Sequence, residues 1–164
     1  MNRYFKLISL IFFCSMFLLT GCQATTGSLL GATAPDDTLI DLSTKTGENQ
    51  RWQDFYIIVD YTLNRQADKL SIDGKFIFSD YVKGNLKKVG DVKLWLFLLD
   101  DEKRVVEYKQ VARTVSSNVD DSVNINAELS LSVEVTAIAF GYRGALVSDG
   151  RQREFIWKLP HKNK

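Results

Sequence analysis

The stretch Lys69–Ser79, KLSIDGKFIFS, indicates the fold class of this chain. Every second residue is apolar or glycine, and most of the residues between them are polar. This period of two is typical of a strand that buries one face. A second stretch, Val92–Leu99 or VKLWLFLL, is instead apolar on both faces, which is typical of a central strand. Together they predict a sheet structure with a substantial core.

Five further segments extend the same pattern along the chain. They are Trp52–Leu63, Val105–Arg113, Ser122–Leu131, Val133–Tyr142 and Arg153–Leu159. Seven short strands separated by turn signals are typical of an all-β antiparallel sandwich. Trp95 on the central strand is similar to the buried tryptophan of immunoglobulin-like domains, although the cysteines of those domains are absent. We therefore predict an immunoglobulin-like β-sandwich over residues 51–164.

The hairpin Leu98–Val106, LLDDEKRVV, carries a loose family resemblance. With this hairpin, the region from Leu70 to Gly144 resembles small extracytoplasmic sandwich domains of the FxLYD type. The resemblance carries no functional residues over to this chain.

The N-terminus has the pattern of a secretory signal. Arg3 and Lys6 precede Leu7–Leu19, an apolar run that is shorter than the roughly 20 residues of a membrane span. The alternatives are an uncleaved signal anchor and a buried helix.

The end of that run, Leu19-Thr20-Gly21-Cys22, resembles the lipobox of bacterial lipoproteins. The resemblance implies that residues 1–21 are cleaved and that the Cys22 sulfur carries a diacylglyceryl group. Acyl chains would hold the protein on a membrane without a spanning helix. Gln23, in place of the aspartate that retains lipoproteins in the inner membrane, implies the outer membrane, facing the periplasm, if the source is Gram-negative.

Residues 22–50 are rich in Thr, Gly, Ser and Ala and contain no aromatic residue. This composition predicts a flexible tether between the lipid and the domain. An alternative for the patch Thr38–Leu42, TLIDL, is that it docks on the domain as an extra strand or turn. The composition changes at Arg51, where we expect an independently stable domain to begin.

The inventory of reactive residues argues against catalysis. The chain has two cysteines, Cys14 in the signal and Cys22, and one histidine, His161, close to the C-terminus. A nucleophilic triad or a zinc site needs more of these ligands. After loss of Arg3 and Lys6, nineteen basic residues face twenty acidic ones, which does not suggest a nucleic-acid partner. We expect a non-enzymatic protein without metal or cofactor.

Three acidic groups and one basic group are the remaining charged motifs. The acidic groups are Asp36-Asp37, Asp100–Glu102 and Asp120-Asp121, and the basic group is Lys83, Lys87 and Lys88. Carboxylates at such places are typical of turns, while calcium binding and acid–base catalysis are the alternatives. We interpret the lysines as a solvated loop, with contact to an anionic surface as the alternative.

Two places are candidates for binding a partner. The first is the face with Trp95 and Phe97, unless the tether, a long loop or a neighbour such as Tyr108 covers it. The second is one end of the sandwich, where three loops and the entering tether are expected to meet. The candidates there are Tyr81, Lys83, Ser117, Asp120, Asp149 and Arg151.

The pair Tyr142-Arg143 is a further candidate anchor, and its alternative is a packed tyrosine in a β-bulge. These features favour a lipid-anchored envelope protein that binds another protein or supports an assembly. A module that binds a small ligand or glycan with its loops is the alternative, and a carboxylate-dependent hydrolase is a more distant one.

Overall fold

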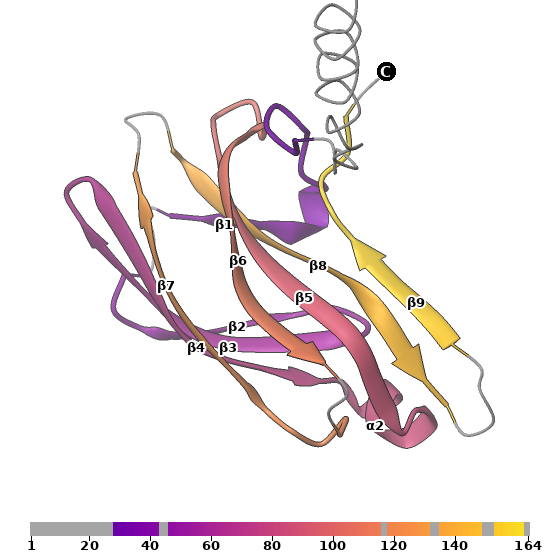
Figure 1. Cartoon of the computed structure of the whole chain (residues 1–164). Helices are drawn as coiled ribbons and strands as arrows, with labels where there is room; N and C mark the ends of the chain where they lie inside the picture. Colours follow the sequence, from indigo (N-terminus) through magenta and orange to yellow (C-terminus); the bar gives the residue numbers. More distant parts are fainter. Residues whose placement is uncertain (1–27, 43–45, 116–117, 132–134, 149–152, 163–164) are drawn as a thin grey trace, which may run out of the picture.

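The computed structural model contains two packed antiparallel sheets, which confirms the predicted all-β sandwich (Figure 1). The structure describes residues 28–42, 46–115, 118–131, 135–148 and 153–162. One sheet contains β1 (Leu39–Asp41), β5 (Lys88–Leu99), β6 (Val105–Val115), β8 (Ala137–Val147) and β9 (Arg153–Lys158). The other contains β2 (Asn49–Gln53), β3 (Ile57–Gln66), β4 (Lys69–Phe78) and β7 (Val123–Ser130).

The order of the strands is that of an immunoglobulin-like sandwich with two additions. The orders β3–β4–β7 and β9–β8–β5–β6 require the chain to change sheets after β4, β6 and β7. The additions are β2, which pairs with β3, and β1, which shares one edge of β8 with β9. Strand β1 pairs with Ala137–Ala139, and β9 pairs with Tyr142–Val147.

The core lies between the two sheets and follows the period of two. In β4 the residues Leu70, Ile72, Phe76 and Phe78 are buried. In β5 the inward residues Val92, Leu94, Leu96 and Leu98 are buried in the same cluster. Alternating inward residues of this kind are how each strand turns one face toward the opposite sheet.

Two connections differ from the sequence prediction. The predicted strand Trp52–Leu63 is two strands, β2 and β3, joined by a turn in which the Asp54 N–H donates to the Ile57 carbonyl. The turn contains no glycine or proline, so the composition does not reveal it. The predicted loop after β4 contains a short helix, α2 (Asp80–Asn85), whose first turn is capped by the Ser79 hydroxyl.

The prediction of a flexible tether up to residue 50 is wrong for the described residues after Ser28. Ala32 and Ala34 are buried, and the Gly31 N–H donates to the Val105 carbonyl. The short 3-10 helix η1 (Asp36–Thr38) and β1 follow, so the alternative of an extra strand near residue 40 is confirmed. Small residues such as Ala32 allow the segment to pack closely against a sheet. A segment rich in small residues is also typical of a linker, so its composition does not distinguish the two.

The N-terminal segment also arrives at a different end of the sandwich than predicted. Thr33 forms bridges with Arg104, in the turn between β5 and β6, and with His161 near the C-terminus. This end lies opposite α2 along the length of β5, as Figure 1 shows. The prediction was wrong because it treated β2 and β3 as one strand and so missed the reversal of the chain between them.

The packing of the N-terminal segment can be tested with a matched pair of variants. Ala32→Asp should lower the free energy of unfolding by about 2–4 kcal/mol, because it buries a carboxylate without a partner. Leu30→Asp should have little effect, since Leu30 is 48% exposed. Urea denaturation of both variants measures the difference. Equal stability of the two would show that residues 29–34 do not pack on the sheet.

Candidate functional site

The outer face of the β5 sheet is covered over the half nearer to Leu99, which is the upper half in Figure 1. Phe97 is fully buried against Ala32 and Ala34, and its ring lies 5.8 Å from that of Tyr108. Trp95 is half-buried against the same cluster. The hypothesis that Phe97 belongs to an exposed patch is therefore wrong. The alternative that the tether segment and Tyr108 cover this face is what the structure shows.

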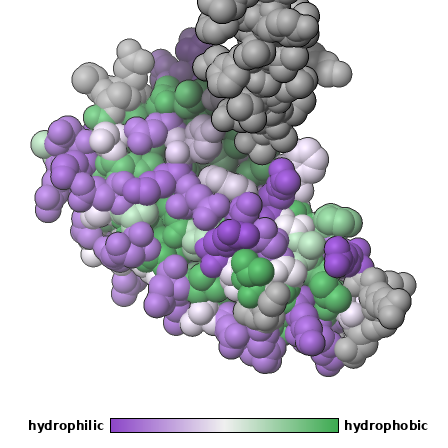
Figure 2. Space-filling view, in the orientation of Figure 1, coloured by the Kyte–Doolittle hydropathy of each residue, from purple (hydrophilic) through white to green (hydrophobic). Residues whose placement is uncertain are grey.

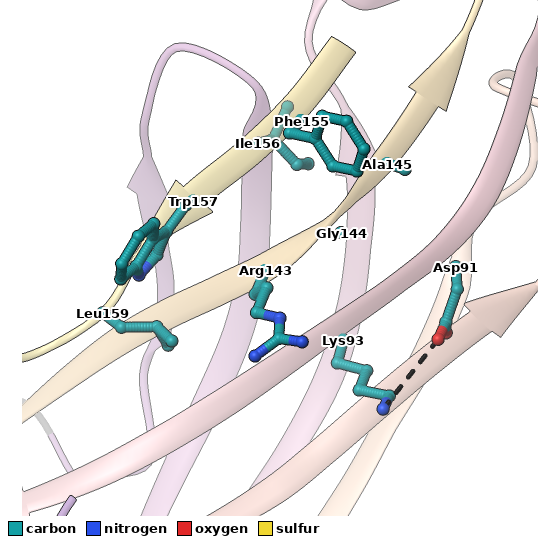
Figure 3. A pocket seen from close by; sticks show the side chains of 9 residues that line it. All are labelled: Asp91, Lys93, Arg143, Gly144, Ala145, Phe155, Ile156, Trp157 and Leu159. Carbon is teal, nitrogen blue, oxygen red and sulfur yellow. Dashed lines mark ion pairs between the residues drawn. The ribbon is translucent and has the colours of Figure 1, made fainter. Parts of the chain in front are cut away.

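The lower half of the same face is open and holds a hollow of about 480 Å³. Phe155 and Trp157 of β9 border it and are 76% and 74% exposed. Figure 3 shows the Trp157 ring to one side of the Arg143 side chain from β8, the Phe155 ring near Ala145, and the Lys93 side chain from β5 beyond Arg143. Figure 2 shows hydrophobic residues among hydrophilic ones over β8 and β9. We call this region the outer-face hollow.

A row of basic residues crosses the outer-face hollow. Cross-strand pairing places Trp157 beside Arg143, Arg143 beside Lys93, and Lys93 beside Arg113. Asp91 is the carboxylate among the residues that line the hollow, and it accepts a bond of 2.9 Å from Arg113 Nε. That bond is the main reason why the pKa of Asp91 is lowered. Arg143 forms no ion pair among the described residues.

The pair Tyr142-Arg143 is divided between the two faces of β8. Successive side chains of a strand point to opposite faces, so Arg143 is exposed while Tyr142 is 1% exposed in the core. The role of Tyr142 as a surface anchor is therefore wrong, and the alternative of a packed tyrosine is correct. The pairing of β5 with β8 has no register shift here, so the expected bulge is absent.

Tyr142 instead belongs to a polar cluster that joins the two sheets beside β9. Its hydroxyl donates to Asp54 in the turn between β2 and β3. Lys158 Nζ lies 3.2 Å from Asp54 Oδ1 and 2.8 Å from Asp37 Oδ2. The cluster thereby ties η1, β9 and the β2–β3 turn together.

The same cluster shifts the titration of its members. Burial alone would raise the pKa of Asp54, but hydrogen bonds from Tyr142, from the Phe55 N–H and from Lys158 hold it below its usual range. Burial and the bond to Asp54 raise the pKa of Tyr142. The site therefore favours an ionised Asp54 and a neutral Tyr142, which is a structural arrangement rather than a proton-transfer pair.

Three aromatic residues form a second group, which we call the distal aromatic patch: the exposed Phe55 and Tyr81 and the half-buried Tyr56. The rings of Phe55 and Tyr81 lie 4.4 Å apart, and those of Phe55 and Tyr56 lie 4.8 Å apart. Phe55 is 57% and Tyr81 is 40% exposed. The Ser79 hydroxyl donates to the Phe55 carbonyl at 2.7 Å, so the turn before β3 and helix α2 are held together.

The loops predicted to meet at one end do meet there. Lys88 bridges Asn118, and the Lys87 N–H donates to the Val147 carbonyl. Lys83 is half-buried in α2, and Asp120 is exposed in a turn. The candidates Ser117, Asp149 and Arg151 lie outside the described residues.

The sequence analysis missed Phe55, Phe155 and Trp157. Phe55 lay inside a predicted continuous strand. In β9 the alternation is clear, but it does not say which face is inward, because Glu154, Ile156 and Lys158 alternate with the two aromatic residues. The structure buries Ile156 and exposes Phe155 and Trp157. The charged neighbours of Ile156 would have suggested the opposite orientation.

The acidic groups have local partners. Asp100 accepts bonds from the Arg104 N–H and from Arg104 Nε, at 2.8 and 3.0 Å. Asp36 pairs with Lys103. The described part of the chain contains no group of three or more His, Cys, Asp or Glu residues suited to a metal ion. It also contains no helix with the length and hydropathy that a membrane crossing requires.

Comparisons with known proteins add no identification. No protein-family model matches the chain, and no curated protein is significantly similar to it.

The polar cluster predicts a specific loss of stability in acid. Because the folded-state pKa of Asp54 lies below its unfolded value, its contribution is present above the unfolded pKa of about 4 and is lost as the pH falls through the folded value. Asp54→Asn should cost about 1–3 kcal/mol at neutral pH, and this deficit should shrink as the pH falls below the unfolded pKa of about 4.

Urea denaturation between neutral and acidic pH measures this difference. Asp101→Asn, an exposed turn residue, is the matched control and should follow the wild type throughout. A deficit of Asp54→Asn that stays constant with pH would contradict an ionised Asp54 in the cluster.

Proposed function

We propose that this chain is a lipid-anchored, non-enzymatic β-sandwich of the bacterial envelope that binds a partner protein. The anchor is supported by the basic start, the short apolar run and the lipobox resemblance at Leu19–Cys22. Gln23 supports the outer membrane, with the domain in the periplasm, for a Gram-negative source.

The observation that carries partner binding is the distal aromatic patch. Phe55 and Tyr81 come from separate connections, lie with their ring centroids 4.4 Å apart and are 57% and 40% exposed. Rigid aromatic side chains at a surface are the usual anchors of protein interfaces, because they bury a large area at low entropic cost. The bonds of Ser79 hold both segments in place before any partner arrives.

The position of the patch is suited to a membrane-held protein. The N-terminal segment reaches the opposite end, beside Arg104 and His161. The patch lies on the other side of Lys158, which bonds both to Asp37 of η1 and to Asp54, the residue before Phe55. A lipid at Cys22 would therefore attach the chain beside Arg104 and His161 and leave Phe55 and Tyr81 accessible to a partner.

A small-ligand module and a hydrolase have less support. Phe55 and Tyr81 are 57% and 40% exposed, whereas small-molecule sites enclose most of their ligand in a concave pocket. Asp54, the acid beside the patch, is held by Tyr142 and Lys158. A catalytic acid would need a raised rather than a lowered pKa.

Site-specific crosslinking in cells tests partner binding. A photoreactive phenylalanine in place of Tyr81 should give a discrete adduct on illumination, because the patch contacts the partner. The same group at Asn64, an exposed residue of β3 near the other end, is the matched control and should give none. Phe55→Ser should reduce the adduct at position 81 without changing the melting temperature. Equal adducts at positions 64 and 81, or none at 81, would contradict the proposal.

A further inference from the structure

The outer-face hollow is a second exposed surface that the distal aromatic patch does not explain. Phe155 and Trp157 expose about three quarters of their surface side by side on β9. Exposed apolar groups of this kind, rimmed by polar residues, mark contact sites for membranes or proteins. What the hollow contacts can be argued from the path of the chain and from charge.

The path of the chain leads from this face toward the anchor. Leu29 packs with Phe97 and Leu159 on the upper half of the same sheet face. Five residues separate Ser28 from Cys22, so the fully extended chain reaches about 20 Å from Ser28. A lipidated Cys22 would thus hold this face within a short distance of the bilayer.

The charges of the hollow favour an anionic contact. Arg143, Lys93 and Arg113 are adjacent in one row across three strands, and like charges in such positions repel one another. Asp91 bonds to Arg113 and lies 3.9 Å from Lys93, so it offsets only part of the row. Phosphate groups placed over the row would offset the remainder.

The aromatic residues fit the same contact. Trp157 lies directly beside Arg143 at one end of the basic row. Tryptophan is favoured at the level of lipid headgroups, because its ring is apolar and its N–H is polar. Basic side chains next to it can reach the phosphates while the rings enter the interface.

We infer that the outer-face hollow docks on the anionic bilayer that carries the Cys22 anchor, with Trp157 and Phe155 in the interface and Arg143 and Lys93 on lipid phosphates. This inference rests on the lipid anchor of the proposed function, but not on its protein partner. The sandwich would then lie with the β5 sheet toward the membrane, leaving the β3 sheet and the distal aromatic patch accessible.

Tryptophan fluorescence of the full lipoprotein tests the docking. The protein is reconstituted in phosphatidylethanolamine vesicles with or without phosphatidylglycerol, using lipids brominated near the headgroup end of their acyl chains. Trp52 is buried, Trp95 is half-buried and Trp157 is exposed, so bromine should quench mainly Trp157. Trp157→Phe should lose most of the quenching while it keeps an apolar ring at that position.

Charge variants then test the basic row. Arg143→Glu should lower the quenching in phosphatidylglycerol vesicles, and added salt should lower it in the wild type. Lys87→Glu makes the same charge change near α2 and should leave the quenching unchanged. Acyl labelling of Cys22 is measured in the same samples.

The results that would overturn the docking are distinct from those that would overturn partner binding. Quenching of Trp157→Phe equal to that of the wild type, in a protein that stays with the vesicles, would overturn it. The docking would also be overturned if the Trp157 ring of the vesicle-bound protein stays in water and a crosslinker at this position captures a protein in cells. Loss of the protein from the vesicles, without acyl label on Cys22, would overturn the anchor and the docking together. The adduct at position 81 is independent of all three.

Discussion

The burial of both faces of β5 is the constraint on which the rest of the structure depends. Its inward residues fill the core between the sheets, while Phe97 and Leu99 are buried on the outer side. A two-layer sandwich leaves that outer side to solvent, so a third layer is needed. The chain supplies it with residues 29–34, and Ala32 and Ala34 close over Phe97. Because the outer side of β5 must be covered, the N-terminal segment is fixed to the outer face of the β5 sheet.

This attachment gives each remaining surface a position relative to the N-terminus. The outer-face hollow continues directly from the covered area, whereas the distal aromatic patch lies on the β2–β3 turn and helix α2. Between them, Tyr142, Asp54 and Lys158 tie the β9 edge to the β2–β3 turn across the two sheets. A rigid connection of this kind would allow the two proposed contacts, with a protein and with the membrane, to form without remodelling either surface.

The sequence predicted those parts of the fold in which hydrophobic period and packing agree. The alternation of Lys69–Ser79 and the two apolar faces of Val92–Leu99 predicted β4 and β5 correctly. The N-terminal layer was missed because Ala32 and its neighbours have the small side chains of a linker, and only tertiary contact makes them core. Tyr81 was predicted as a loop residue available for binding. Trp157 was not predicted as a surface residue, because the alternation in β9 does not show which face is inward.

Hydrogen exchange of the full chain measures the central claim, that the N-terminal segment is part of the sandwich. The amides of Gly31 and Thr33 donate to the Val105 and His161 carbonyls, and that of Leu42 donates to Thr136. The account predicts that all three exchange about as slowly as the amide of Leu96 in the central strand β5, because they open only with the sheet. Exchange of Gly31, Thr33 and Leu42 at the rate of an unfolded chain, while Leu96 stays protected, would contradict it.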